Sequence, residues 1–214
     1  ITGDLLLAYQ ECMGTTKTGW LALFGGGGSG AERAANLVGR VLMGFGAAAQ
    51  QFVEPLLSTA DRDQRKLLID YHIGLADPGR FGALLNRFPL LEVLQRINQA
   101  DEEPLQRFFA ALEGDDPVLT VLLREPVFAR DVDLLRALPQ AKDPEALLKA
   151  LCNRQPGHEL IQAAIEGLVD GGQRAASRRV LTALGGGTVD HLVACYADLD
   201  RPEALRTAVG EVLV

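Results

Sequence analysis

Residues 143–151 read Asp-Pro-Glu-Ala-Leu-Leu-Lys-Ala-Leu, and residues 201–205 repeat the opening as Arg-Pro-Glu-Ala-Leu. Both place proline where the first turn of a helix would lie, and there its missing N–H has no partner to lose. A neighbouring carboxylate can cap that turn or offset the positive end of the helix dipole. An acidic residue followed by proline recurs at Asp77-Pro78, Glu103-Pro104, Asp116-Pro117 and Glu125-Pro126. Each site is therefore predicted to open a short helix.

Apolar residues recur every three or four positions around these openings, which is the period of an amphipathic helix. The runs are Leu67, Leu68, Tyr71 and Leu75; Leu105, Phe108, Phe109 and Leu112; Leu147, Leu148 and Leu151; Leu160, Ile161, Ile165 and Leu168; Val180, Leu181 and Leu184; and Leu192, Val193 and Tyr196. The intervals between openings are unequal, so no named repeat is assigned. We predict an all-α array of short antiparallel helices, either solenoid-like or an irregular helical bundle.

A glycine-rich run divides the chain. Residues 25–30 read Gly-Gly-Gly-Gly-Ser-Gly, the composition of a flexible linker, natural or engineered. We expect residues 1–24 to form a helical peptide or docking arm, and residues 31–214 to form an all-helical domain. Within that domain residues 31–57 suit one long helix, with a bend or an end at Pro55.

Composition narrows the function classes. The formal charge of the 214 residues is −7, which argues against nucleic acid, because affinity for nucleic acid comes mainly from neutralised phosphates. No stretch reaches the roughly 18 apolar residues of a membrane span, so stable membrane insertion is not expected. The three cysteines, Cys12, Cys152 and Cys195, are too far apart for a disulfide framework, and the start of the chain lacks the basic region of a signal peptide. A cytoplasmic protein with free thiols is therefore expected.

Motifs for chemistry are weak. Gly25, Gly27 and Gly30 fit a dinucleotide-binding spacing, but the strands and the acidic residue that this fold requires are missing. His191 and Cys195 are four residues apart and could share one helix face, yet two ligands do not make a metal site. The acidic pairs Asp61 with Asp63, Glu102-Glu103 and Asp115-Asp116 stand at helix starts, where capping explains them. No catalytic residue, cofactor or metal is predicted.

Two groups of residues are candidates for recognition. The N-terminal peptide is too apolar to stay exposed, so it is expected to pack into a groove of residues 31–214. Its predicted anchors are Leu5, Leu6, Tyr9, Trp20 and Phe24. A second group, Arg174, Arg178 and Arg179, forms a basic face that could dock an acidic ligand. Arg174 and Arg178, one helical turn apart, repel each other unless an acidic partner or a ligand lies between them.

The sequence therefore predicts a non-enzymatic protein–protein interaction module, such as an adaptor, a scaffold or a chaperone-like protein. It would bind an amphipathic helical peptide in a groove between helices, and residues 1–24 could be such a partner, tethered by the linker. Two alternatives stay open. One is a membrane-active effector or toxin with a releasable helix over residues 31–57, and the other is a helical enzyme of unknown chemistry.

Overall fold

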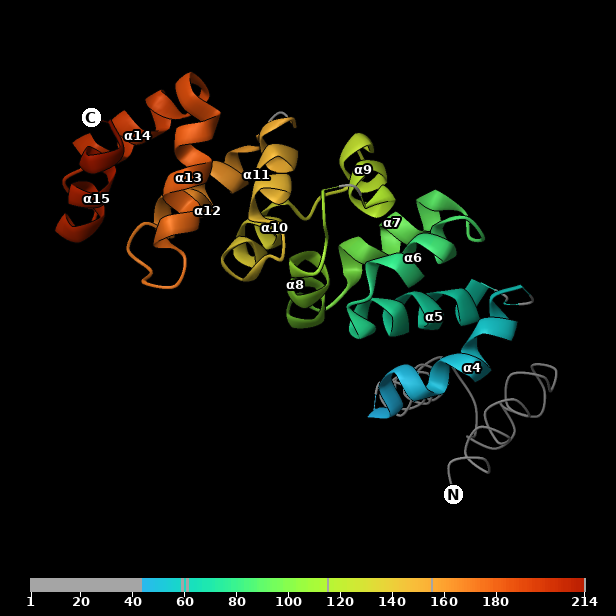
Figure 1. The fold of residues 1–214 in the computed structure, drawn as a ribbon. Helices are drawn as coiled ribbons and strands as arrows, with labels where there is room; N and C mark the ends of the chain where they lie inside the picture. Colours follow the sequence, from blue (N-terminus) through green and yellow to red (C-terminus); the bar gives the residue numbers. More distant parts are fainter. Residues whose placement is uncertain (1–43, 59, 61, 115, 155, 214) are drawn as a thin grey trace, which may run out of the picture.

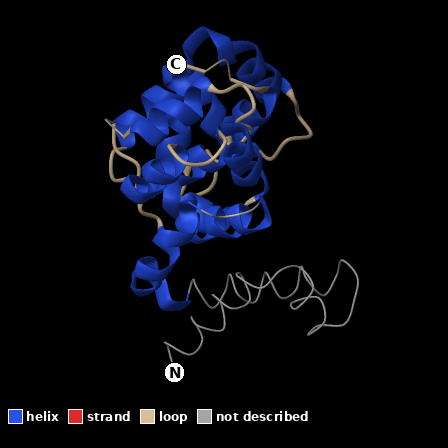
Figure 2. Cartoon of the chain, turned by 90° about the vertical axis from the view of Figure 1, so that its right-hand side faces the viewer, coloured by secondary structure: helices blue, strands red, loops and turns tan. Residues whose placement is uncertain are grey.

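The computed structural model describes residues 44–58, 60, 62–114, 116–154 and 156–213. Over these residues the chain is helical, and Figure 2 shows helices joined by loops with no strand among them. The predicted all-α array is therefore confirmed. The predicted peptide 1–24 and the glycine-rich linker 25–30 lie outside the described residues.

The described helices follow one another with short connections. In chain order they are η1 (Gly46–Ala49), α4 (Gln50–Val53), η2 (Glu54–Ser58), α5 (Arg62–Leu75), α6 (Pro78–Leu85), α7 (Leu90–Gln99), α8 (Glu102–Ala110), α9 (Pro117–Arg124), α10 (Asp131–Ala137), η3 (Leu138–Gln140), α11 (Pro144–Cys152), α12 (His158–Glu166), α13 (Arg174–Leu184), η4 (Gly185–Thr188), α14 (Val189–Ala197) and α15 (Glu203–Leu213). Figure 1 shows them as an elongated array, with α4 near one end and α14 and α15 at the other.

The helices stack in two rows. Helix α5 contacts α8, α8 contacts α10, and α10 contacts α12, which makes a first row. The second row runs in parallel through α6, α9, α11 and α13 by the same kind of contact. Helices α14 and α15 contact α12 and α13 respectively, so they extend both rows. The described chain is thus a solenoid-like stack of helix pairs, in which each pair packs mainly on its neighbours.

The second-row helices, taken alone, show a regular period. Its helices α9, α11, α13 and α15 begin at Pro117, Pro144, Arg174 and Glu203, so 27 to 30 residues separate consecutive starts. The first interval is longer, because α7 is inserted between the α5–α6 pair and the α8–α9 pair. The sequence alone did not reveal this period.

The acidic residue before proline opens three second-row helices as predicted. The carboxylate of Asp77 accepts from the backbone N–H of Arg80 at 3.2 Å, and that of Asp143 accepts from Ala146 at 3.0 Å. The carboxylate of Asp116 accepts from Val118 at 2.8 Å. Such a cap stabilises a helix by about 1 kcal/mol. These caps fix where the second helix of a pair begins.

Two local predictions are wrong. Glu125-Pro126 does not open a helix, since Glu125 is the C-terminal cap of α9 and the next helix begins at Asp131. Proline here follows a helix end, another position where it is common. The single helix expected over residues 31–57 is not continuous in its described part. That part consists of η1, α4 and η2, after Gly46 adopts a φ of +52° that a helix interior does not accept.

Every first-row helix carries four matching positions, spaced three, one and three residues apart, and all of them are apolar except His72. The sets are Leu68, Tyr71, His72 and Leu75 on α5; Leu105, Phe108, Phe109 and Leu112 on and after α8; Leu134, Ala137, Leu138 and Ala141 along α10 and η3; Ile161, Ala164, Ile165 and Leu168 on and after α12; and Leu192, Cys195, Tyr196 and Leu199 on and after α14. In the first four sets every member is buried, apart from Leu75 and Ala141, which are partly buried. These positions form the core between successive pairs.

Ion pairs join successive helix pairs at the surface. Glu102 on α8 binds Arg136 on α10 with 3.0 Å between Oε2 and Nη1, Glu145 on α11 binds Arg179 on α13 at 2.5 Å, and Glu113 binds Lys142. In all three the earlier pair supplies the carboxylate and the later pair the cation. Between α13 and α15 the order is reversed, since Arg174 binds Glu211 at 3.0 Å.

Candidate interaction surface

Helix α14 carries an apolar strip on its exposed side. The strip consists of Val189, Val193 and Tyr196 together with Leu199, which follows the helix, and their exposed fractions are 43, 50, 52 and 79%. We call these four residues the α14 strip. The three helical members are spaced by four and three residues and therefore share one face. The other large apolar side chains that are exposed, Leu91, Val127, Val169 and Leu213, are spread over other elements. Contiguous exposed apolar patches are common at interaction sites, so the α14 strip is the candidate surface.

The stacking pattern explains why this strip is exposed. Tyr196 occupies the position of Phe109, Leu138 and Ile165 in the earlier first-row helices, and all three of these are at most 2% exposed. Leu199 likewise occupies the position of Leu112 and Leu168, which are also buried. Phe109, for example, contacts Phe128 in the loop that leads into the next pair. Helices α14 and α15 end the described stack (Figure 1). Here the corresponding side chains, Tyr196 and Leu199, are exposed.

Carboxylates border the α14 strip. Asp190, Asp198, Asp200 and Glu203 are all exposed. Asp198 binds Arg201 of the same turn, with 3.5 Å between Oδ2 and Nε. Within the described part of the chain, no ion pair is found for Asp190, Asp200 or Glu203. The strip is thus an apolar face with a negative edge.

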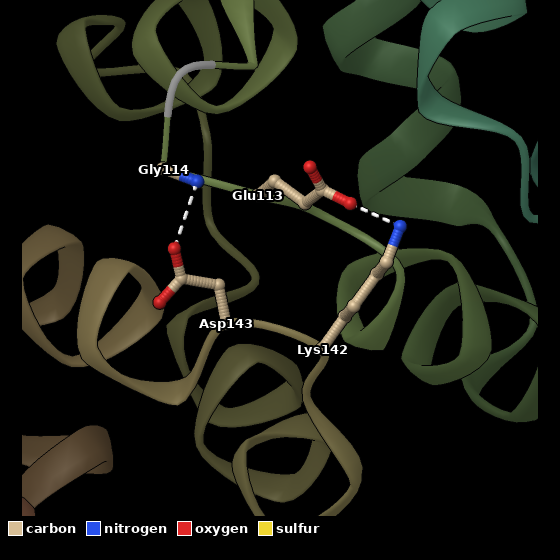
Figure 3. Close-up of a pocket in the computed structure, with 4 residues that line it drawn as sticks. All are labelled: Glu113, Gly114, Lys142 and Asp143. Atoms are coloured by element: carbon tan, nitrogen blue, oxygen red, sulfur yellow. Dashed lines mark hydrogen bonds and ion pairs between the residues drawn. The ribbon is translucent and has the colours of Figure 1, made fainter.

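A shallow hollow lies between the loops of two helix pairs. It measures about 480 Å³ and is lined by Glu113, Gly114, Lys142 and Asp143 (Figure 3). Its polar groups bind one another, because Lys142 pairs with Glu113, and Asp143 Oδ2 accepts from the Gly114 N–H at 3.1 Å. The hydrogen bond and charge of Glu113 raise the pKa of Lys142, which keeps the lysine cationic and a poor base or nucleophile. Three of its four lining residues are charged.

Three carboxyl groups have shifted pKa values, but each one binds an arginine. Burial raises the pKa of Asp70, Asp131 and Asp133 above the ordinary value for aspartate. Their partners are Arg96, Arg154 and Arg130 respectively, the last two at 3.1 and 2.8 Å. The nearby arginines act in the opposite direction and lower these pKa values. None of the three carboxyl groups lines the hollow.

One group of predicted recognition residues lies outside the described residues, and the other lies within them. Leu5, Leu6, Tyr9, Trp20 and Phe24 lie outside the described residues. The basic face on α13 is described, and its three arginines already have partners in this chain, two of them carboxylates. Arg174 binds the Glu211 carboxylate, Arg178 donates to the Glu211 carbonyl at 3.5 Å, and Arg179 binds Glu145. An acidic ligand at this face would have to compete with Glu211 and Glu145.

The structure brings together two histidines that the sequence kept apart. The rings of His158 and His191 lie 5.3 Å apart between centroids, one at the start of α12 and the other on α14. Cys195 is partly buried and packs on the core, as expected for a core cysteine. Among the described residues no cluster of three or more His, Cys, Asp or Glu side chains is placed to hold a metal ion.

Sequence reasoning did not single out the α14 strip. The apolar period over Leu192, Val193 and Tyr196 predicted that all three residues contribute to the core, but Leu192 alone is buried. Alignment of the first-row helices by their four shared positions would have shown that Tyr196 and Leu199 belong to the face that a following helix covers. That alignment requires knowing which helices form the first row.

In comparisons with known proteins, no protein family, no curated protein and no solved structure matches this chain. Within the described residues, no helix is long and apolar enough to cross a membrane.

Proposed function

We propose that this protein is a non-enzymatic interaction module, of the adaptor, scaffold or chaperone-like kind, and that the α14 strip is its recognition surface. The observation that carries this proposal is the exposure of Tyr196 and Leu199, at 52 and 79%, at positions whose counterparts in the earlier helix pairs are buried or partly buried. Complementary apolar side chains that cover this strip would remove water from it. Large aromatic and aliphatic anchors dominate the energy of such contacts.

The partner we propose is an amphipathic helix. A helix presents its apolar residues every three or four positions, which matches the spacing of Val189, Val193 and Tyr196. The proposed surface is the face of one helix rather than a groove between helices. The hollow at Glu113 and Lys142 is polar and does not support the groove expected from the sequence.

A protein partner fits the charge better than nucleic acid does. The formal charge of −7 and the carboxylates beside the strip would repel phosphates. Cys152 and Cys195 are both free thiols, which supports the proposal of a reducing compartment such as the cytoplasm.

Substitution within the strip tests the function. We compare the wild-type chain with a Tyr196→Ser/Leu199→Ser variant in binding a fluorescently labelled amphipathic peptide, measured by anisotropy. The matched control is Leu91→Ser, since Leu91 is 55% exposed on α7, away from the strip. We expect the double variant to lose at least tenfold in affinity, about 1.4 kcal/mol, while the control binds like the wild type. Equal binding by all three proteins contradicts the proposal.

No observation on the described residues favours the two alternatives. The membrane-active alternative depends on one long helix over residues 31–57, whereas residues 46–58 form the short helices η1, α4 and η2. The enzyme alternative needs a pocket with a shifted acid or base, whereas the shifted carboxyl groups described above bind arginines.

A further inference from the structure

We infer that the partner of the α14 strip is an amphipathic helix with a basic edge, held by Glu203 and Asp200 in the way that one helix pair holds the next. The inference rests on the function proposed above and adds to it the charge of the partner. It comes from comparing the last described helix pair with the junctions between the earlier pairs.

Glu203 has the place in α15 that Glu145 has in α11. The two helices open as Pro144-Glu145-Ala146-Leu147 and Pro202-Glu203-Ala204-Leu205, and Leu147 and Leu205 are both buried beneath the turn that carries the glutamate. Glu145 binds Arg179 of the following second-row helix. Glu203 is exposed, and no ion pair is found for it within the described residues.

Asp200 has the place of Glu113 in the first row. Glu113 directly follows Leu112, and Asp200 directly follows Leu199, the corresponding member of the last set. Glu113 binds Lys142, which stands at this same position in the next helix pair. Each of the two carboxylates in the last pair therefore stands where one earlier junction receives a cation from the pair that follows.

The apolar and charged positions together define the occupant. A helix that covers Tyr196 and Leu199 as the next pair would do so must bury apolar residues at the usual spacing of three and four. Lysine or arginine along its edge would then lie near Glu203 and Asp200. The reversed pair of Arg174 with Glu211 shows that cation and carboxylate can exchange sides at a junction, but Arg174 lies on α13 and is already occupied.

Charge argues against a second copy of the same face. Two α14 strips brought together would place Asp190, Asp200 and Glu203 of each copy near the same carboxylates of the other. Like charges brought together at an interface disfavour it. A basic-edged helix instead gains attraction at Asp200 and Glu203.

Three synthetic peptides test the inference against the full chain. The first has leucines at positions i, i+3, i+4 and i+7, repeated over about five turns, with lysines beside them. The second has the same leucines with glutamates in place of the lysines. The third has the composition of the first with the leucines shuffled, so that no apolar face forms. Binding is measured by anisotropy at low ionic strength, where exposed charges are least screened.

We expect the lysine peptide to bind about five- to tenfold tighter than the glutamate peptide, since two exposed ion pairs contribute modestly. The shuffled peptide should bind weakest. The Tyr196→Ser/Leu199→Ser variant should lose its affinity for both leucine-faced peptides. If the lysine and glutamate peptides bind equally through Tyr196 and Leu199, the proposed function stands and the charge inference fails. If neither binds through those residues, the proposed function fails as well. If the shuffled and the ordered lysine peptides bind with equal affinity, the inference is overturned. The attraction of lysines to a chain of charge −7 then explains the binding.

Charge reversal gives a second test with its own control. The Asp200→Lys/Glu203→Lys variant should bind the glutamate peptide with several-fold higher affinity than the lysine peptide. Glu103 is an exposed carboxylate in the first turn of α8, distant in the stack, so Glu103→Lys should leave the preference unchanged. A preference that does not move in the double variant, or that moves as much in Glu103→Lys, overturns the inference. Self-association of the wild type that Tyr196→Ser/Leu199→Ser abolishes would identify a second copy as the occupant and also overturn it.

Discussion

Phe109 and Phe128 meet edge to face, with 5.9 Å between their ring centroids and 72° between their planes. Phe109 lies one residue before the end of α8, and Phe128 comes from the loop that leads into α10, so the contact joins two helix pairs. Arg154 lies over the Phe128 ring, with its guanidinium carbon 5.2 Å from the ring centre. Tyr196 stands at the position of Phe109 in the last described pair, where its ring lies beside Gly210 and is 52% exposed.

The same truncation should therefore have different costs at these two positions. Phe109→Ala removes a fully buried ring and is expected to destabilise the fold by about 3–5 kcal/mol. Tyr196→Ala removes a ring that is 52% exposed and should cost about 1 kcal/mol or less. Urea unfolding followed by circular dichroism measures both. Equal costs would mean that Tyr196 is part of the core and is not a free surface.

The local rules of the sequence predicted the helices well, because caps and apolar periods act within one helix. The opening at Asp143-Pro144 and the period through Leu147 and Leu151 correspond directly to α11. The arrangement of the helices in two rows was not predicted, because the pairs of an acidic residue and proline do not all begin helices of the same row. Glu103-Pro104 lies in the first turn of the first-row helix α8, Glu125-Pro126 follows a helix end, and α7 lengthens one interval.

The candidate site could not be predicted by the same rules. Val193 and Tyr196 have the helical spacing of core residues, and spacing does not tell whether a neighbouring helix covers them. The exposure of these side chains depends on which helix pair packs against them. The basic face at Arg174 shows the opposite case, since its acidic partner Glu211 lies 37 residues further along the chain, beyond the reach of any local pattern.

Asp143 should be more important for stability than other helix-opening aspartates. Its carboxylate accepts from Ala146 N at 3.0 Å, which caps α11, and from Gly114 N at 3.1 Å, which joins two helix pairs. Asp143→Ala is expected to cost about 1–2 kcal/mol, because two backbone donors lose their acceptor. The matched control is Asp101→Ala, since Asp101 stands at the start of α8 without a side-chain capping bond. Urea unfolding that shows equal losses for both variants contradicts the double role of Asp143.

His72 should make the fold sensitive to acid. It is 3% exposed, and its Nδ1 donates to the Leu68 carbonyl at 2.7 Å. Burial lowers its pKa, and the charge of Arg80 acts in the same direction, against smaller opposite effects of the Leu68 hydrogen bond, Asp77 and Glu54. A depressed folded-state pKa gives stability that is present above the pKa of an unfolded histidine and is lost as pH falls through the folded value.

The His72→Leu variant tests this sensitivity, because the first-row helix η3 has leucine at the same position, Leu138. We expect the wild type to lose stability more steeply than the variant as pH falls below about 6.5, the ordinary pKa of histidine. Above that pH the difference between the two proteins should be constant. Urea unfolding at a series of pH values measures both curves. Parallel curves across the acidic range would show that His72 contributes no pH dependence.

Gly167, the residue that follows α12, lies close to Ser177 on α13. A Cβ added there would lie 2.2 Å from Ser177 Oγ, and 3.3 Å from both Ser177 Cβ and the Ala163 carbonyl oxygen. Rotation of the hydroxyl relieves the first contact but not the other two, so Gly167→Ala should cost about 1–3 kcal/mol by forcing the helices apart. Gly171→Ala is the matched control, because no atom lies within 4 Å of its added Cβ, and it should be close to neutral.

Ser177 is fully buried, and its Oγ has no hydrogen-bond partner among the described residues. Ser177→Ala should therefore be tolerated alone and should recover part of the loss when combined with Gly167→Ala. Thermal or urea unfolding in which the double variant shows the full sum of both effects would mean that the helices do not meet at this point.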